Sequence, residues 1–237
     1  MDDELDFQNY LFLSPKCLKI KIFRKQDFKD LYFNETYTDI SLNKLNFEFV
    51  NLFLDKNIFQ IEKKTKKIIE NINLIIDSDE FFTINLSIKK DNHGEILKKQ
   101  DLSHLLSKAK YECKETINFR RITHMLIDNY YIDKKNYSSL PENLRCNLFS
   151  IDIRFICLSE IYIKEIEKIL KKYQITIDNI LNSEYVEGFF NNKDQDIFKL
   201  SSKIIDGLNE NEVSIVPKMT NNKGFFERFF NFFSYLS

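Results

Sequence analysis

The sequence predicts a mixed α+β protein, because apolar residues recur with two different periods along the same chain. In Phe81–Ile88 and Leu148–Cys157 apolar and polar residues alternate, which is typical of half-buried strands. In Gln100–Thr116 and Glu160–Tyr173 apolar residues recur every three to four positions, which predicts amphipathic helices. With 237 residues, 43% of them hydrophobic, the chain can bury a core for one or two domains.

The first ninety residues predict strands with one helix between them. Four predicted strands form a meander with a bend at Ser14–Cys17: Tyr10–Leu13, Leu18–Phe23, Phe23–Phe33 and Phe47–Leu54. A further strand is predicted over Phe81–Ile88. Between Ile58 and Ile72 apolar residues follow a helical spacing and lysines occupy the other side. This pattern predicts a helix with one solvated face.

The second half predicts a compact α+β module followed by a polar tether. Its predicted elements are a helix over Gln100–Thr116, strands over Ile122–Ile132 and Leu148–Cys157, a helix over Glu160–Tyr173, a strand over Ile175–Ile177 and a helix over Ile180–Phe190. The polar segment Asn191–Asn222 predicts a tether with one short helix near Asp196–Leu208.

Charge and cysteine spacing exclude several function classes. Lysine and arginine (35) nearly balance aspartate and glutamate (36), so nucleic acid is not an expected partner. The cysteines Cys17, Cys113, Cys146 and Cys157 form no CxxC pair, and the three histidines show no ligand spacing, so neither a metal site nor a disulfide framework is expected. The acidic start and the lack of a membrane-spanning apolar run predict a cytoplasmic protein.

The last fourteen residues predict an amphipathic helix that lies on a membrane. Its apolar face consists of Phe225, Phe226, Phe229, Phe230, Phe232, Phe233 and Leu236. At 100° per residue these side chains fall within roughly 160°, and polar residues fill the opposite face. The segment is too short to span a bilayer but suits the headgroup boundary. The alternative is a terminal helix that packs its phenylalanines against this chain or a second copy.

Three consecutive segments resemble the bacterial cell-division protein family FtsA, which has an actin-like fold. His124–Asp133 is similar to a strand motif of the family, matching at His124, Tyr130, Ile132 and Asp133 but carrying Ile127 and Asp128 where the family has Pro and Gln. Leu148–Cys157 resembles the next strand, with Arg154 in place of His, and Ile163–Ile180 resembles the helix and strand that close subdomain 1C.

The resemblance implies a reduced actin-like (ribonuclease-H-like) lobe with an inserted 1C module of the SHS2 type and a C-terminal amphipathic helix. The implied domains are 1–90, a subdomain 1A-like lobe completed by 179–192; 91–178, the 1C-like module; 193–222, a flexible tether; and 223–237, the membrane helix. Too few residues follow Gly188 for the second lobe of an actin-like ATPase.

The hairpin that binds phosphate in actin-like proteins is degenerate here. Ser14, Lys16 and Cys17 stand where the family has Asp, Gly and Thr. Phosphate binding at such a turn depends on glycine and on free backbone N–H groups, and Pro15 removes one donor. We therefore expect no catalytic residues, no metal and no cofactor.

The function implied by the resemblance is a non-enzymatic adaptor of the division machinery. It would act at the division septum, on the cytoplasmic face of the inner membrane, and bind lipid through its C-terminal helix. In the family, subdomain 1C contributes to self-association and to contact with division proteins, including the cytoplasmic tail of FtsN. The main FtsZ-binding surface belongs to the second lobe. The alternatives are a soluble α+β interaction domain with a docked tail, and one lobe of a split actin-like ATPase.

Overall fold

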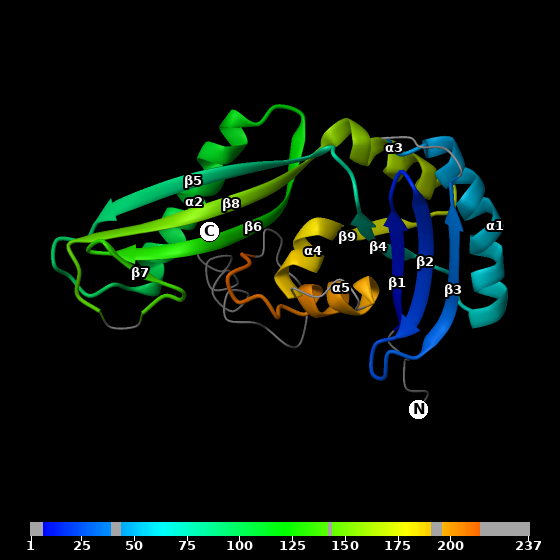
Figure 1. Ribbon diagram of the computed structural model, residues 1–237, viewed down its shortest axis with the longest axis horizontal. Helices are drawn as coiled ribbons and strands as arrows, with labels where there is room; N and C mark the ends of the chain where they lie inside the picture. Colours follow the sequence, from blue (N-terminus) through cyan, green and yellow to red (C-terminus); the bar gives the residue numbers. More distant parts are fainter. Residues whose placement is uncertain (1–6, 39–43, 142–143, 191–195, 214–237) are drawn as a thin grey trace. The chain divides into compact units, whose positions relative to one another are not determined.

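The computed structural model describes residues 7–38, 44–141, 144–190 and 196–213, which form two compact units (Figure 1). Unit 1 comprises residues 1–81 and 159–206, and unit 2 comprises residues 82–158 and 207–237. Most of unit 2 is therefore an insertion in the chain of unit 1.

Unit 1 is built on a five-stranded mixed sheet. Its strands are β1 (Phe7–Leu13), β2 (Cys17–Arg24), β3 (Asp30–Tyr37), β4 (Asn71–Ile76) and β9 (Thr176–Asn182), in the order β3-β2-β1-β4-β9. The first three strands form an antiparallel meander, and β4 lies parallel to both β1 and β9. This is the strand order of the ribonuclease-H-like sheet on which actin-like lobes are built, as expected from the sequence.

Helices cover both faces of this sheet. They are α1 (Phe47–Thr65), α3 (Glu160–Lys171), α4 (Ser183–Phe190) and α5 (Ile197–Ile205). Helices α1 and α3 touch each other, with the rings of Phe47 and Tyr162 5.3 Å apart. Helices α4 and α5 pack on the other face, where Phe198 joins a core cluster with Tyr10 and Phe23. Burial on both faces explains why five consecutive residues of β4 are buried, four of them apolar and the fifth Asn73.

The prediction of a strand over Phe47–Leu54 is wrong, because these residues form the first half of α1. Asn46 caps the helix by accepting a hydrogen bond from the N–H of Phe49. The buried residues of α1 are Val50, Phe53, Leu54, Asn57, Ile58 and Ile61. Their helical spacing continues without a break past Leu54, whereas the prediction ended a strand at Leu54 and began the helical pattern only at Ile58. The helix ends at Thr65 and is capped by Lys66, which has a left-handed backbone conformation, so Ile68–Ile72 lie beyond it.

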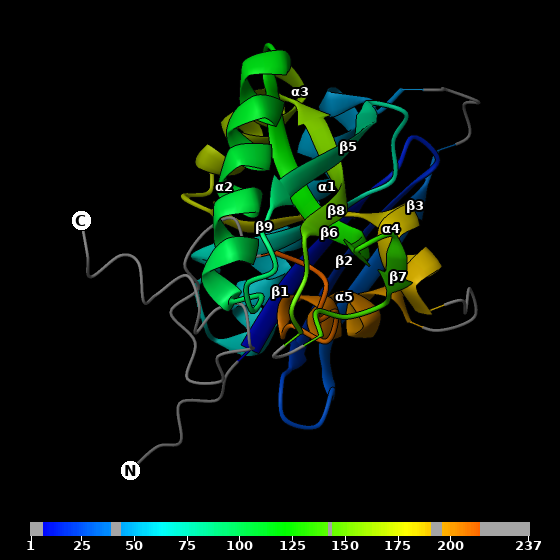
Figure 2. The same ribbon diagram turned by 90° about the vertical axis from the view of Figure 1, so that its left-hand side faces the viewer.

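Unit 2 is a four-stranded sheet with one helix. Its elements are β5 (Phe81–Asp91), α2 (Lys99–Thr116), β6 (Arg120–Ile132), β7 (Lys135–Tyr137) and β8 (Leu148–Ser159), with the sheet order β5-β8-β6-β7. Apart from the short β7, the chain order is strand, helix, strand, strand. Helix α2 covers one face of the sheet (Figure 2) and contributes Leu105, Leu106 and Ala109 to the core of the unit.

The boundary between the predicted module and the lobe needs correction at both ends. Strand β5, expected in the lobe, pairs with β8 in unit 2. Helix α3 and the start of β9 (176–178), expected in the 1C-like module, belong to unit 1, where β9 pairs with β4. The rest of β9 (179–182) was expected in the lobe and lies there. The predicted helix over Ile180–Phe190 begins only at Ser183, since Ile180–Asn182 still pair with β4.

The short helix predicted near Asp196–Leu208 is confirmed as α5, but the described part of the segment 193–222 is packed against the protein and is not a flexible tether. Helix α5 buries Phe198, Leu200 and Ile204 in unit 1. Beyond it, Val213 is 3% exposed and belongs to the core of unit 2. These apolar side chains provide the burial that compensates for ordering the backbone.

Candidate functional site

The turn between β1 and β2 is the place where a phosphate-binding hairpin was considered. The N–H of Ser14 donates to the carbonyl of Cys17 (3.0 Å), and the N–H of Lys16 donates to Oγ of Ser14 (3.3 Å). Pro15 has no N–H to offer. Two donors are thus used within the turn and a third is missing, so three of its four residues present no free amide to an anion.

A second segment closes the turn from outside. The N–H of Thr38 donates to the carbonyl of Lys16 (3.0 Å), and its hydroxyl donates to the carbonyl of Pro15 (2.9 Å). Ser14 and Cys17 are 5% and 7% exposed, and burial raises the pKa of the Cys17 thiol. The turn is therefore a packed structural corner. The three residues singled out from the sequence, Ser14, Lys16 and Cys17, do lie together in this closed turn.

The carboxyl ends of the neighbouring strands are likewise occupied by structural hydrogen bonds. Asp77 follows β4 and donates its N–H to the carbonyl of Leu13 (2.9 Å). Asn182 ends β9, and its side-chain oxygen accepts a hydrogen bond from the N–H of Tyr185 (2.6 Å) at the start of α4. Within the described ranges, no group of three or more His, Cys, Asp or Glu side chains could hold a metal ion.

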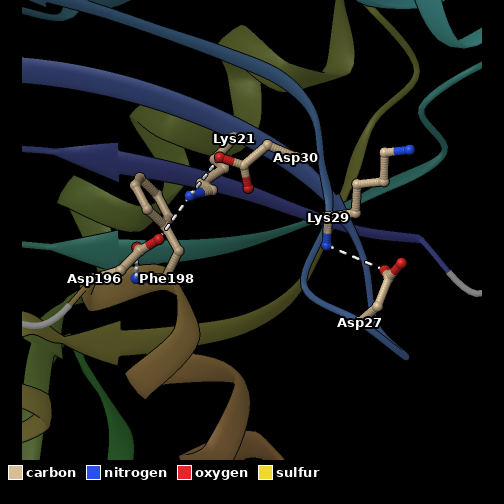
Figure 3. A network of polar contacts seen from close by, with 6 residues as sticks. All are labelled: Lys21, Asp27, Lys29, Asp30, Asp196 and Phe198. Atoms are coloured by element: carbon tan, nitrogen blue, oxygen red, sulfur yellow. Dashed lines mark hydrogen bonds and ion pairs between the residues drawn. The ribbon is translucent and has the colours of Figure 1, made fainter.

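A buried lysine occupies the sheet face that α5 covers (Figure 3). Nζ of Lys21 lies 2.6 Å from Oδ2 of Asp196 and 3.1 Å from Oδ2 of Asp30. It also lies 5.7 Å from the ring centres of Phe33 and Phe198. Burial acts to lower the pKa of Lys21, but the two carboxylates outweigh it and the pKa lies above its usual value.

This network holds α5 on the sheet. The side chain of Asp196 also accepts the N–H of Phe198 (3.0 Å) and so caps α5. Because each carboxylate is paired with the lysine, the arrangement serves attachment of the helix. No local sequence pattern predicts this network, since Lys21 and Asp196 are 175 positions apart.

The sheet face of unit 2 opposite α2 carries a polar cluster centred on Asp152. Its carboxylate accepts hydrogen bonds from Oγ of Ser87 (2.6 Å) and Nδ2 of Asn129 (3.3 Å). Tyr131 also donates to Asp152, and this bond raises the pKa of the tyrosine. A surface depression of about 410 Å³ lies here, lined by Tyr131, Lys134, Leu148, Ser150 and Asp152. Its mix of anionic, cationic and aromatic groups suits a polar segment of another protein.

The membrane-binding residues predicted from the sequence lie outside the described residues. These are Phe225, Phe226, Phe229, Phe230, Phe232, Phe233 and Leu236. Among the helices that the structure does describe, none has the length and apolar character needed to cross a membrane.

The comparisons with known proteins bear on the fold only. No protein-family profile matches the sequence, and no curated protein matches it. Similar solved structures include the "PilM-PilN type IV pilus biogenesis complex" (9% identity, TM-score 0.47, 77% of this chain and 49% of that chain). Another is the cytoplasmic domain of EpsL, an inner-membrane component of the type II secretion system of Vibrio cholerae (9%, 0.35, 76% and 57%).

A third similar structure is a Bacteroides thetaiotaomicron protein with an actin-like ATPase fold and unknown function (15% identity, TM-score 0.33, 80% of this chain and 58% of that chain). The chain thus spans about half the length of these proteins. These structures are similar to this chain in fold, and their functions are not transferred to it.

Proposed function

We propose that this chain is a non-enzymatic, membrane-tethered adaptor of the bacterial cell-division machinery, similar to FtsA. The observation that carries the proposal is the closed turn at Ser14–Cys17 on a ribonuclease-H-like sheet. Nucleotide-binding lobes use this turn to hold phosphate, whereas here its donors bond within the protein. A lobe that keeps the sheet without the phosphate cradle is suited to holding other proteins in place. The proposal predicts that the full chain does not bind Mg-ATP in calorimetry; saturable binding would favour the split ATPase.

The proposed membrane contact is the phenylalanine face of residues 223–237, on the cytoplasmic face of the inner membrane. Burial of several phenylalanine side chains at about 1.5–3 kcal/mol each gives reversible attachment after the cost of ordering the helix. The full chain should therefore sediment with phospholipid vesicles. Phe229→Glu with Phe233→Glu should abolish sedimentation, whereas Asn231→Glu with Ser234→Glu on the polar face adds the same charge and should preserve most of it. If both double variants lost sedimentation equally, the added negative charge, and not loss of the phenylalanine face, would explain the effect.

The proposed partner surface is the Asp152 cluster of unit 2. In the family that the sequence resembles, subdomain 1C contacts division proteins, and the polar depression at Tyr131 and Asp152 offers this unit a comparable recognition surface. We expect the FtsN cytoplasmic tail, or a second copy of the chain, to bind here. Asp152→Lys should weaken binding of a labelled FtsN tail peptide, and Asp91→Lys, an exposed position of β5, serves as the charge control.

Localisation tests the whole proposal. A fluorescent fusion of the full chain should form a mid-cell band, and a version ending at Lys223 should become diffuse. A diffuse signal from both would refute the membrane role and favour the soluble interaction domain. A band from both would show that protein contacts alone recruit the chain.

A further inference from the structure

The outer edge of β6 is only partly covered by β7. Strand β7 pairs with Tyr130, Tyr131 and Ile132, which leaves most of the thirteen-residue strand β6 without β7 beside it. An open strand edge offers unpaired N–H and C=O groups to any extended segment. Part of this edge is occupied by the chain itself, after it leaves α5.

The occupying segment is Asn209–Val213, which we call the strap. The N–H of Ile127 donates to the carbonyl of Asn211 (2.9 Å), and the N–H of Val213 donates to the carbonyl of Met125 (2.8 Å). Together they make an antiparallel bridge between Leu126 and Glu212. The strap thus adds one short strand to the sheet by main-chain pairing.

Side chains fix the register of the strap. Val213 is 3% exposed and packs in the core cluster that contains Met125 and Ile127. Nδ1 of His124, itself 3% exposed, lies 2.8 Å from Oε1 of Glu212. The amide of Asn211 accepts from the hydroxyl of Tyr130 and donates to the carbonyl of Ser138, both at 3.3 Å. One docked position is defined by the buried side chain of Val213, the contact between His124 and Glu212, and the two hydrogen bonds of the Asn211 amide.

We propose that the strap ties the C-terminal tail to unit 2 and thereby sets the length of the membrane tether. This inference rests on the proposed membrane attachment. With the strap docked, the eleven residues 214–224 separate unit 2 from Phe225, which limits their reach to about 40 Å. With the strap released, the free linker would begin after α5 at Gly207 and reach about 65 Å. Docking also assigns the tail to unit 2, so unit 2 is the part held near the membrane.

Hydrogen exchange on the full chain tests whether the strap docks as described. In the wild type the amides of Ile127 and Val213 should be protected. Val213→Asp places a carboxylate in the core and should speed exchange at both sites about tenfold or more. Glu212→Gln should give a smaller acceleration at the same sites. Leu208→Asp makes the same kind of change at a residue that is 53% exposed and should have no effect.

Protection at Ile151 of β8 must persist in every variant, which separates release of the strap from unfolding of unit 2. If Val213→Asp unfolds the unit, Glu212→Gln decides the question. Rapid exchange at Ile127 and Val213 in the wild type, or unchanged exchange in both variants, would overturn the proposal.

Energy transfer from a labelled protein to vesicles tests the tether. A dye on Tyr111→Cys, at an exposed position of α2, would report its distance from acceptor lipids in vesicles of phosphatidylethanolamine and phosphatidylglycerol. Transfer should fall in Val213→Asp and stay at the wild-type level in Leu208→Asp, with equal sedimentation of all three. Equal transfer would overturn the tether claim even if exchange shows release. Failure of the wild type to sediment would refute the membrane function, while the exchange result would still decide whether the strap docks.

Discussion

The two units bury their sheets differently. In unit 1 helices cover both faces, and β4 contributes buried residues to both, with Leu74 and Ile75 fully buried on opposite sides. Among the described residues of unit 2, α2 is the only helix on the sheet, and the first eight residues of β8 alternate between buried and partly exposed. A sheet covered on both faces must neutralise any charge it contains, as it does at Lys21. A sheet covered on one face leaves a polar surface that can serve recognition.

The largest expected effect is the loss of stability when adjacent residues of β4 are truncated, compared with adjacent residues of β8. Leu74→Ala and Ile75→Ala should each destabilise the protein by about 2–5 kcal/mol, because both remove buried side chains. In β8, Ile151→Ala should cost a similar amount, whereas Ser150→Ala should change stability by less than about 0.5 kcal/mol. Urea unfolding followed by circular dichroism would measure all four. If either Leu74→Ala or Ile75→Ala lowered the free energy of unfolding only slightly, the sheet of unit 1 would not be buried on both faces.

The next effect separates two roles of Asp196 in unit 1. Asp196→Ala removes the cap of α5 and the ion pair with Lys21, and should cost about 2 kcal/mol. Asp196→Asn keeps a good capping side chain but loses the charge, so it should cost about 1 kcal/mol. Denaturant unfolding provides both values. Equal costs for the two variants would mean that the ion pair contributes the whole effect.

A smaller effect concerns acid stability of unit 2. Burial alone would raise the pKa of Asp101, but bonds from the side chain of Lys90 and the N–H of Lys98 (2.8 Å) outweigh it and lower the pKa. Because the pKa of Asp101 is lower in the folded state than in the unfolded state, its ionised carboxylate stabilises the fold at pH values above the unfolded pKa. This stability is lost as the pH falls through the folded-state pKa. Asp101→Asn should therefore flatten the loss of stability below about pH 5, with a change of about 1 kcal/mol at neutral pH.

The charge partner provides the control for this prediction. Lys90→Met removes the cation and keeps the carboxylate, so it should also weaken the acid dependence, though less than Asp101→Asn. Thermal unfolding across the acidic range would compare the three proteins. A curve for Asp101→Asn that runs parallel to the wild type would show that another group causes the acid sensitivity.

The sequence predicted those elements whose signal is local. Alternation in Leu148–Cys157 and helical spacing in Gln100–Thr116 identified β8 and α2, because each pattern reports contact with one core face. The sequence did not place the first residues of β9 (176–178) in the lobe. Its partner β4 lies about a hundred residues earlier, and a short apolar run such as Ile175–Ile177 does not name the strand beside it.

The same distinction applies to the candidate sites. The lack of glycine, and of an N–H at Pro15, in the Ser14–Cys17 turn was predictable, because it depends on residue types alone. Closure of that turn by Thr38 was not, and neither was the polar cluster in which Ser87 meets Asp152, 65 positions away. The strap depends on the pairing of His124 with Glu212 across 88 positions. Contacts of this kind follow from topology, which a single sequence does not contain.

The smallest expected effect distinguishes a surface tyrosine from a buried one. The pKa of Tyr131 is raised mainly by its hydrogen bond to Asp152, whereas burial raises the pKa of Tyr130, its neighbour in β6. Asp152→Asn removes the charged acceptor, so the pKa of Tyr131 should fall toward the ordinary value while that of Tyr130 stays high. Carbon-13 NMR of labelled tyrosine rings would follow both, and Asp91→Asn, at the end of β5, provides the control. If the pKa of Tyr131 did not change in Asp152→Asn, burial rather than the hydrogen bond would be what raises it, and the polar face of the sheet would be less exposed than the comparison of the two units implies.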